Sequence, residues 1–344
     1  MIKYLGSKRL LIPAILDAVG SVGGLPGATT VLDLFSGTSR VGHALKRAGY
    51  RVIAVDHNAY AHALGTCYVQ ADAEGVLDDA ARLVAEFNAL PGAPGYFTET
   101  FCERSRYLQP RNGERVDAIR EAIAGKGLGP ELEAVMLVSL MEAADRVDST
   151  TGLQMAFLKR WSRRSQNGLE LRVPAVLPRA AAGAGKAHRL DAAEAAGRFA
   201  VDVAYVDPPY NQHSYLGNYH VWESLVLWDK PEVWGVACKR VDVRERRSAF
   251  NSRPGFPGAL RRVLESLRAR AIVLSFSDEG FISSEELEAM LATLFCGAAR
   301  VRATSVDYKR YVGAQIGIYS PEGVKVGRAG HLRNTERVYV VTPG

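Results

Sequence analysis

Hydrophobic and polar positions along the chain follow two alternating patterns. Residues 29–35, 50–55 and 201–206 are nearly continuous runs of β-branched and apolar side chains, which is typical of strands buried on both faces. Between the first two runs, residues 40–48 repeat their apolar positions at helical spacing. Residues 29–55 therefore predict a strand–helix–strand unit, and such units form parallel sheets with helices on the faces.

The middle of the chain has a different pattern. Helical spacing recurs at residues 75–90, 116–124 and 131–147, between clusters of Pro, Gly and Asn. Strand-like runs return at 201–206, 271–275, 300–306 and 337–341. We predict an α/β fold in which residues 1–68 and 187–344 form one Rossmann-like sheet and residues 69–186 form an inserted, mainly helical domain. A flexible Ala/Gly stretch at 179–186 is the expected exit from the insertion.

Composition argues against several classes of protein. With 344 residues, of which 47% are hydrophobic and 23% charged, the chain has ordinary globular values and the length of about two domains. The first nine residues do not resemble a signal peptide, and no apolar run reaches the ~18 residues that a membrane span requires. The cysteines form no CxxC pair, so we expect no metal site, no disulfide framework and a cytoplasmic location; they are Cys67, Cys102, Cys238 and Cys296.

Charge is unevenly distributed along the sequence. Residues 239–270 contain ten Lys or Arg against three Asp or Glu, and residues 159–198 contain nine against three. Residues 70–148 reverse the balance, with fifteen acids against eight bases. The net charge of +6 by itself indicates only a basic surface, but the clustering predicts that a polyanion would be attracted to one part of that surface.

A first candidate site follows the first strand. The residues Asp33, Leu34, Phe35, Ser36, Gly37, Thr38 and Ser39 lie where a strand gives way to a helix, which is where a doubly wound sheet leaves a crevice for nucleotide-like ligands. Gly37 would let the backbone approach such a ligand closely. The pattern is not G-x-G-x-x-G, because the glycines that accommodate a pyrophosphate are missing. A nucleotide-like cofactor is therefore favoured over a dinucleotide.

Asp56 ends the second predicted strand, nineteen positions after Gly37. A carboxylate at this place can accept hydrogen bonds from both hydroxyls of a ribose. An ordinary helix cap is the competing interpretation of a lone aspartate after a strand.

A second candidate site is the sequence Asp207-Pro208-Pro209-Tyr210, directly after the strand predicted at 201–206. Two consecutive prolines preset a rigid, extended backbone that lacks two amide donors, while its carbonyls remain able to accept hydrogen bonds. The Asp207 carboxylate and the Pro208 carbonyl could accept the two hydrogens of an aromatic amine, and Tyr210 offers a ring for stacking. The competing interpretation is a turn that only terminates the strand.

Together these motifs resemble the Dam-type, alpha-group family of adenine-specific DNA methyltransferases. The resemblance covers most of the chain: Tyr4 and Lys8 lie in a segment similar to the family's K-W/Y-x-G-x-K, residues 33–39 look like its FxGxG cofactor loop, and Asp207 to Tyr210 match its DPPY motif. It implies that S-adenosyl-L-methionine is bound by these residues together with Asp56, the neighbouring His57, Asp191 and Asp207. One departure is Ser39, which replaces the second glycine of FxGxG and puts the shape of the loop in question.

The resemblance also implies a mechanism and partners. Asp207 and the Pro208 carbonyl would accept hydrogen bonds from the exocyclic N6 amine of adenine while Tyr210 stacks on the base, which must leave the duplex at a cost of a few kcal/mol. The motif order is that of the alpha group, so residues 69–186 would be the target-recognition domain. The partners would be double-stranded DNA and, in a restriction-modification system, a cognate endonuclease. One chain defines neither the target sequence nor the choice between monomer and homodimer.

Candidate DNA contacts come from the basic stretches and from the aromatic residues after the DPPY motif. A solvated basic face and ordinary helix packing are the competing interpretations. The candidates are Lys159, Arg160, Arg163, Arg164, Lys309 and Arg310 for phosphates, with Tyr215 and Tyr219 for the pocket.

Several alternatives share these motifs. Cytosine presents the same exocyclic amine, RNA could replace DNA, and a protein glutamine amide is a further acceptor, although similar enzymes carry Asn at the Asp207 position. A non-catalytic DNA-binding module with this fold is the alternative of another class, and intact Lys8, Asp56 and Asp207 argue against it. A nicotinamide dehydrogenase is disfavoured by the missing glycines.

Overall fold

The computed structural model describes residues 1–22, 29–309, 318–319, 325–327 and 333–344. Its centre is a seven-stranded sheet in the order β3-β2-β1-β4-β7-β11-β8. The strands are β1 Thr30–Leu34, β2 Arg51–Asp56, β3 Lys186–Arg189, β4 Ala200–Val206, β7 Arg268–Ser277, β8 Ala299–Lys309 and β11 Arg333–Pro343. The strands β3, β2, β1, β4 and β7 each pair in parallel with their neighbours in this order, whereas β11 is antiparallel to both β7 and β8. The predicted Rossmann-like sheet is confirmed, and it also contains β3, which was not predicted.

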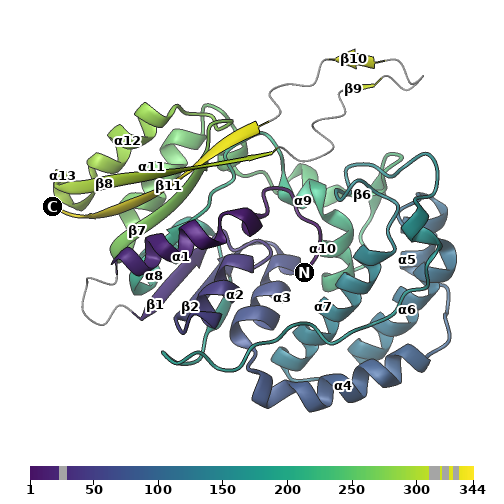
Figure 1. The fold of residues 1–344 in the computed structure, drawn as a ribbon. Helices are drawn as coiled ribbons and strands as arrows, with labels where there is room; N and C mark the ends of the chain where they lie inside the picture. The colour runs from purple at the N-terminus through teal and green to yellow at the C-terminus, as the bar shows by residue number, and fades with distance from the viewer. Residues whose placement is uncertain (23–28, 310–317, 320–324, 328–332) are drawn as a thin grey trace.

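Helices cover both faces of the sheet (Figure 1). Alternate side chains of each strand point to opposite sides of the sheet, so both faces present apolar side chains to these helices. Leu32, Ala204 and Leu274 face α8 Ala192–Arg198, α11 Phe256–Ser266 and α12 Ser284–Ala292 in one apolar cluster. Val31, Val203 and Val273 face α1 Ile12–Ser21 and α2 Arg40–Arg47 in another. Burial on both faces explains why these strands are continuous apolar runs.

A third apolar cluster forms the helical part of the molecule. It contains α3 Ala59–Gly65, the π-helix Thr66–Gln70, α4 Ala73–Ala89, α5 Tyr96–Thr98, the π-helix Glu99–Glu103, α6 Pro110–Gly125 and α7 Pro130–Arg146. The helices predicted at 75–90, 116–124 and 131–147 are therefore confirmed. Leu64 on α3 and Trp222 on α10 His220–Leu227 belong to the same cluster, so these helices share one core with elements before and after them. The limits 69–186 for a separate domain stay a prediction.

The first residues of the chain are held against α7. The Met1 amino group pairs with Glu142, and Lys3 Nζ lies 3.0 Å from Asp148 Oδ1. Ile2 is buried in the helical core. This anchoring brings the short 3₁₀ helix Lys8–Leu10 to the end of the sheet where β1 and β4 finish.

The remaining elements connect these layers. They are α9 Tyr215–Asn218, β5 Val233–Trp234, β6 Lys239–Arg240, the 3₁₀ turns Arg163–Gln166, Val241–Arg244 and Ala249–Asn251, α13 Leu294–Gly297, β9 Ile318–Tyr319 and β10 Lys325–Gly327. Within the described ranges, no helix is both long and apolar enough to cross a bilayer. The four cysteines are unpaired thiols, of which only Cys296 is exposed.

Candidate active site

The loop after β1 has an unusual backbone that its sequence explains only in part. Gly37 has φ of +50°, and a Cβ placed there would lie 3.2 Å from the Tyr4 ring. Only glycine avoids both the left-handed strain and the close approach. Ser39 also has a positive φ, of 53°. The loop therefore keeps a glycine-like shape at Ser39, at a conformational cost of about 1 kcal/mol.

Ser39 lies apart from the other residues of this loop. It is fully buried at the start of α2, and it does not line the cavity that Phe35, Ser36, Gly37 and Thr38 line. A direct cofactor contact by the Ser39 side chain stays a prediction. Its role in this structure is to shape the turn.

Asp33 lies beneath the loop and is almost completely buried. Its carboxylate accepts a hydrogen bond of 2.9 Å from the Gly42 backbone N–H. Burial, together with the nearby Asp207 carboxylate, raises the pKa of Asp33 to about 8. A positively charged ligand in the cavity would compensate for this unfavourable burial of an acid.

Asp56 ends β2 and faces the same cavity. Its Oδ2 accepts a hydrogen bond of 3.0 Å from the Gly37 N–H, and its Oδ1 accepts one of 3.0 Å from the Asn58 N–H. His57 is half-exposed, with Nδ1 3.8 Å from the Asp56 carboxylate. The carboxylate thus orders the loop after β1 and the start of α3 at once, and it remains on the cavity wall.

The cavity at this end of the sheet has an empty volume of about 810 Å³, part of it open to solvent. It joins the two predicted sites, since its lining includes Tyr4, Lys8, Asp33, Gly37, Arg40, Asp56, Asp207, Pro209, Tyr215 and Arg246. A second hollow continues past Phe35 and Asp56 to Asp191, which also caps α8 by accepting from the Ala193 N–H at 2.8 Å.

Asp207 follows β4 and makes close contacts through one oxygen. Its Oδ1 lies 2.9 Å from Lys8 Nζ and accepts a hydrogen bond of 3.0 Å from the Ser275 hydroxyl on β7. Burial raises the pKa of the Asp207 carboxyl to about 6, against the opposing effect of the Lys8 ammonium. The carboxylate is therefore fixed in orientation and remains ionised above that pH.

The rest of the DPPY motif surrounds Asp207. Pro209 lines the cavity, while Pro208 is buried. The Tyr210 ring packs edge-on against Phe276, with centroids 5.4 Å apart, and Lys8 Nζ lies 5.6 Å from the Tyr210 centroid. The Tyr210 carbonyl accepts a hydrogen bond of 3.1 Å from the Phe281 N–H. The motif is thus a rigid turn. Tyr210 lies next to the cavity but is not one of the residues that line it.

Two further tyrosines were predicted to touch DNA. Tyr215 stacks on Tyr4 with centroids 5.2 Å apart and lines the cavity. Tyr219 stacks on the Tyr4 ring at 4.5 Å, but it is 1% exposed and its hydroxyl accepts from the Leu5 N–H. The prediction of a DNA contact is therefore wrong for Tyr219, because its side chain packs inside the core behind Tyr4.

Comparison with known proteins decides the family. The model of the D12 class N6 adenine-specific DNA methyltransferases matches residues 4–290, a stretch that contains Tyr4, the loop after β1 and the DPPY motif. The chain belongs to this family. The resemblance seen in the sequence is thereby confirmed.

Curated relatives fall into the same group. Modification methylase StsI of Streptococcus sanguinis is 28% identical over 324 residues, which cover 90% of this chain and 48% of that protein. Type II methyltransferase M.FokI of Planomicrobium okeanokoites is 28% identical over 306 residues, which cover 84% of this chain and 46% of that protein. The chain thus spans about half the length of these two relatives.

Another relative matches along nearly all of its length. Type II methyltransferase M.NlaIII of Neisseria lactamica is 28% identical over 90% of this chain and 92% of that protein. Among solved structures, precorrin-6y C5,15-methyltransferase of Geobacter metallireducens aligns over 98% of this chain and 94% of that one, at 8% identity and a TM-score of 0.33. That structural likeness is too loose to support an argument.

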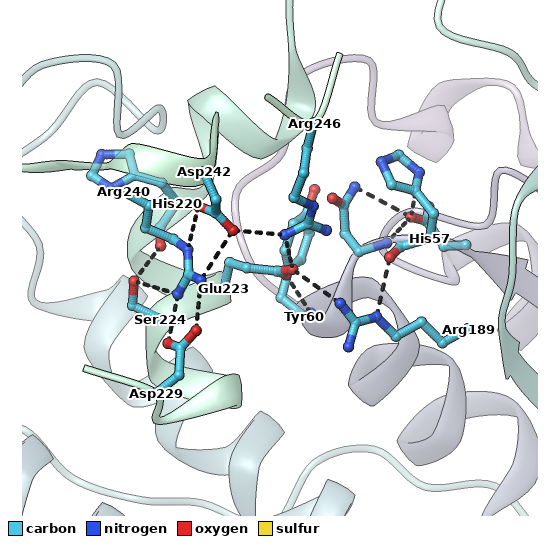
Figure 2. A network of polar contacts seen from close by, with 12 residues as sticks. His57, Tyr60, Arg189, His220, Glu223, Ser224, Asp229, Arg240, Asp242 and Arg246 are labelled. Carbon is cyan, nitrogen blue, oxygen red and sulfur yellow. Dashed lines mark hydrogen bonds and ion pairs between the residues drawn. The ribbon is translucent and has the colours of Figure 1, made fainter. Parts of the chain in front are cut away.

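In this member of the D12 class, a polar network supports the wall of the cavity (Figure 2). Glu223 on α10 is completely buried; its Oε2 accepts from the Tyr60 N–H at 3.1 Å, and its Oε1 pairs with Arg246 at 3.0 Å and with Arg189 at 3.8 Å. Arg246 also lies 3.4 Å from Asp242. Glu223 therefore ties α3, β3 and the basic loop after β6 together at the cavity.

The network continues away from the cavity through Arg240. Its guanidinium, 3% exposed, pairs with Asp229 at 2.6 Å and with Asp242 at 3.0 Å. The sequence marked residues 239–270 only as a basic stretch. In the structure, the positive charge of Arg240 is neutralised by these two carboxylates. Arg240 therefore stabilises the loop and contributes little positive charge to the surface.

The predicted phosphate contacts separate into three groups. Lys159, Arg160 and Arg163 are exposed. Arg164 donates to Asp148 Oδ1 at 2.7 Å and to the Thr150 carbonyl at 2.6 Å, so its guanidinium holds the chain together, and its assignment to phosphate stays a prediction. Lys309 is the last residue of β8 but its side chain, like all of Arg310, lies outside the described residues.

Sequence analysis missed several residues of the site, among them two arginines, a serine and a glutamate. Arg40 and Arg246 line the cavity, while Ser275 and Glu336 contact the Asp207–Lys8 pair from neighbouring strands. Arg40 follows the cofactor loop directly and could have been noticed there. Ser275 and Glu336 carry no local signal, because only the strand order brings them to Asp207.

Proposed function

We propose that this protein transfers a methyl group from S-adenosyl-L-methionine to the exocyclic N6 amine of an adenine flipped out of DNA. The observation that carries the proposal is one cavity bounded by the loop after β1 on one side and by Asp207 and Pro209 on the other. The family assignment supports the adenine specificity. The printed names of the relatives, modification methylase and type II methyltransferase, support DNA as the substrate.

The charges of the cavity suit this cofactor. Asp33, Asp56 and Asp207 line it, and the Lys8 ammonium already lies between Asp207 and Glu336. A ligand with a sulfonium and an ammonium group would offset the negative charge of the carboxylates and would favour release of the proton from Asp33, whose pKa burial raises to about 8. Asp56 would accept from the ribose hydroxyls, and the hollow toward Asp191 would receive the adenine ring. The cofactor supplies the methyl group on a sulfonium, which is its own leaving group.

Arg40 suits the carboxylate of the same cofactor. It lines the cavity directly after the loop, and its buried Nε has no hydrogen-bond partner in the described structure. Burial lowers the pKa of the Arg40 guanidinium, so an anion beside it would be stabilising. A carboxylate could accept two parallel hydrogen bonds from this group.

The chain's own groups would act mainly by positioning. Asp207 and the Pro208 carbonyl would accept the two amine hydrogens, so that the nitrogen lone pair turns toward the methyl group. The negative charge of Asp207 would stabilise positive charge as it develops on the nitrogen. No proton transfer through a separate base is required before the methyl transfer.

For DNA binding, the proposal names surfaces of the protein rather than contacts to single bases. The exposed cations Lys159, Arg160 and Arg163 would contact phosphates. The helices of residues 69–186 would hold the target-recognition surface, and an endonuclease of the same specificity would be the functional partner. These assignments rest on the family and on surface charge.

The first experiment measures methyl transfer from labelled S-adenosyl-L-methionine to unmethylated DNA, followed by digestion and chromatography of the nucleosides. Label should appear in N6-methyladenine and be lost in Asp207→Asn, which keeps the size of the side chain but removes its charge. Glu265→Gln, an exposed carboxylate on α11, is the matched control. Label in cytosine would contradict the adenine assignment, absence of label in DNA would contradict the assignment of DNA as substrate, and absent cofactor binding would contradict the enzyme class.

A further inference from the structure

A buried chain of polar side chains extends behind Asp207 and ends at Glu336 on β11. Lys8 Nζ lies 2.9 Å from Asp207 Oδ1 and 2.7 Å from Glu336 Oε1. Lys8 is 5% exposed and Glu336 1% exposed. One ammonium group is therefore shared by two carboxylates in a place that water scarcely reaches.

The opposite side of Asp207 is fixed by hydroxyl groups. Ser275 on β7 donates its single hydroxyl hydrogen to Asp207 Oδ1, so the Tyr205 hydroxyl, 2.9 Å from Ser275 Oγ, must donate to Ser275. These contacts use Oδ1. The Oδ2 oxygen is thus the one that can accept from an amine.

We propose that Glu336 is a positioning residue for methyl transfer, which acts by sharing the Lys8 ammonium with Asp207. With Lys8 between two carboxylates, its single positive charge is divided between Asp207 and Glu336. If Lys8 paired with Asp207 alone, it would neutralise the carboxylate that has to stabilise positive charge during the transfer. Glu336 therefore leaves Asp207 a stronger acceptor, while Lys8 still fixes its orientation. This inference rests on the proposed function of the Asp207 site.

The fold places Glu336 for this role. β11 is inserted antiparallel between β7 and β8, and Glu336 pairs in register with Ser277 of β7. The residue lies outside the described cavity lining, so it is not expected to touch the cofactor.

The sign of the effect on Asp207 follows from the charges around it. Burial raises its pKa and Lys8 lowers it, while Glu336 raises it further. Asp33 and Tyr215 also feel the Asp207 charge across the cavity. Within the part of the chain that the structure describes, the titratable or polar groups that face Asp207 are Lys8 from the first 3₁₀ helix, Glu336 from β11, Ser275 from β7, Tyr205 from β4, Asp33 from β1, Tyr210 and Tyr215. Removing the Glu336 charge should lower the pKa of Asp207, whereas removing Lys8 should raise it.

The direct test is a pH titration of Asp207 by carbon NMR of protein labelled at the aspartate carboxyl groups, with the Asp207 signal identified by its loss in Asp207→Asn. In Glu336→Gln the midpoint should move down by about one pH unit. In the surface control Glu265→Gln it should not move. An unchanged or higher midpoint in a folded Glu336→Gln protein would overturn the proposal, and this readout does not depend on methyl transfer.

Kinetics provide the second readout. In Glu336→Gln, kcat near neutral pH should fall about tenfold, the change in rate that matches a shift of about one pH unit in the Asp207 midpoint. The acidic limb of kcat should move to lower pH, and the Kd for S-adenosyl-L-methionine should stay within about twofold. A lower kcat with an unmoved acidic limb would assign Glu336 a structural role only. If Glu336→Gln does not fold, Glu336→Asp draws the carboxylate back from Lys8 and should shift the midpoint in the same direction by less. A wild-type protein without DNA methylation would contradict the proposed function, while the NMR titration would still decide the role of Glu336.

Discussion

The Oε1 oxygen of Glu223 lies 3.0 Å from the Arg246 guanidinium, and this pair joins the completely buried face of α10 to the rim of the cavity. Arg246 retains 26% of its side-chain exposure, so one of its faces remains available to a ligand. The pair therefore connects the stability of the helical core with the geometry of the site.

Glu223→Ala should destabilise the fold and weaken cofactor binding together. The change leaves the Tyr60 N–H without its acceptor and removes the counter-charge of Arg246 and Arg189, for a loss of about 2 kcal/mol in the free energy of unfolding. Urea unfolding measures the loss, and isothermal titration measures the affinity. Glu223→Gln keeps an acceptor for the Tyr60 N–H and should recover part of the stability; equal losses in both variants would contradict this explanation.

Gly37→Ala should impair cofactor binding by about tenfold or more while the protein stays folded. The new Cβ would lie 3.2 Å from the Tyr4 ring at a φ of +50°, so the loop or the Tyr4 ring must shift. Calorimetric binding of S-adenosyl-L-methionine measures the effect. Gly20→Ala is the matched control, because Gly20 lies in α1 with nothing within 4 Å of its added Cβ. That variant should gain about 0.5 kcal/mol of stability, and a binding defect there would refute the local explanation.

Asp33 should make the fold less stable as pH rises from about 4 to 8. Its pKa is raised to about 8 in the folded protein, so the native state keeps a proton that the unfolded chain releases near pH 4. The free energy of unfolding then falls with pH, by at most about 1.4 kcal/mol per pH unit from this group. Denaturant unfolding across this range should show a flatter pH dependence for Asp33→Asn than for the wild type. An identical slope in both proteins would show that Asp33 does not carry the effect.

Arg163 and Arg164 are neighbours that should behave differently. Arg164→Ala removes hydrogen bonds to Asp148 and Thr150 and should lower the free energy of unfolding by about 1–2 kcal/mol. Arg163→Ala alters an exposed side chain and should leave stability unchanged. Salt-dependent binding to a DNA duplex should show a slope reduced by about one for Arg163→Ala. Loss of DNA affinity in Arg164→Ala without loss of stability would instead support its assignment as a phosphate contact.

Much of the architecture was encoded locally. The apolar runs at 29–35, 50–55 and 201–206 became β1, β2 and β4, because strands buried on both faces need continuous apolar side chains. The DPPY motif and Asp56 were recognisable because each stands at the end of such a strand. Short strands without this pattern were missed: β3 has only four residues at the edge of the sheet and is half exposed.

Tertiary structure decided which of these side chains work together. Glu336 is far from Asp207 in sequence, and only the insertion of β11 beside β7 brings its carboxylate to Lys8. The same holds for Tyr219 and Arg164, whose residue types suit DNA contact but whose surroundings bury one and pair the other. Local sequence sets strands, turns and the chemistry of single motifs, because these depend on neighbouring residues. Burial, charge sharing and exposure depend on packing between distant segments, so the fold alone determined them.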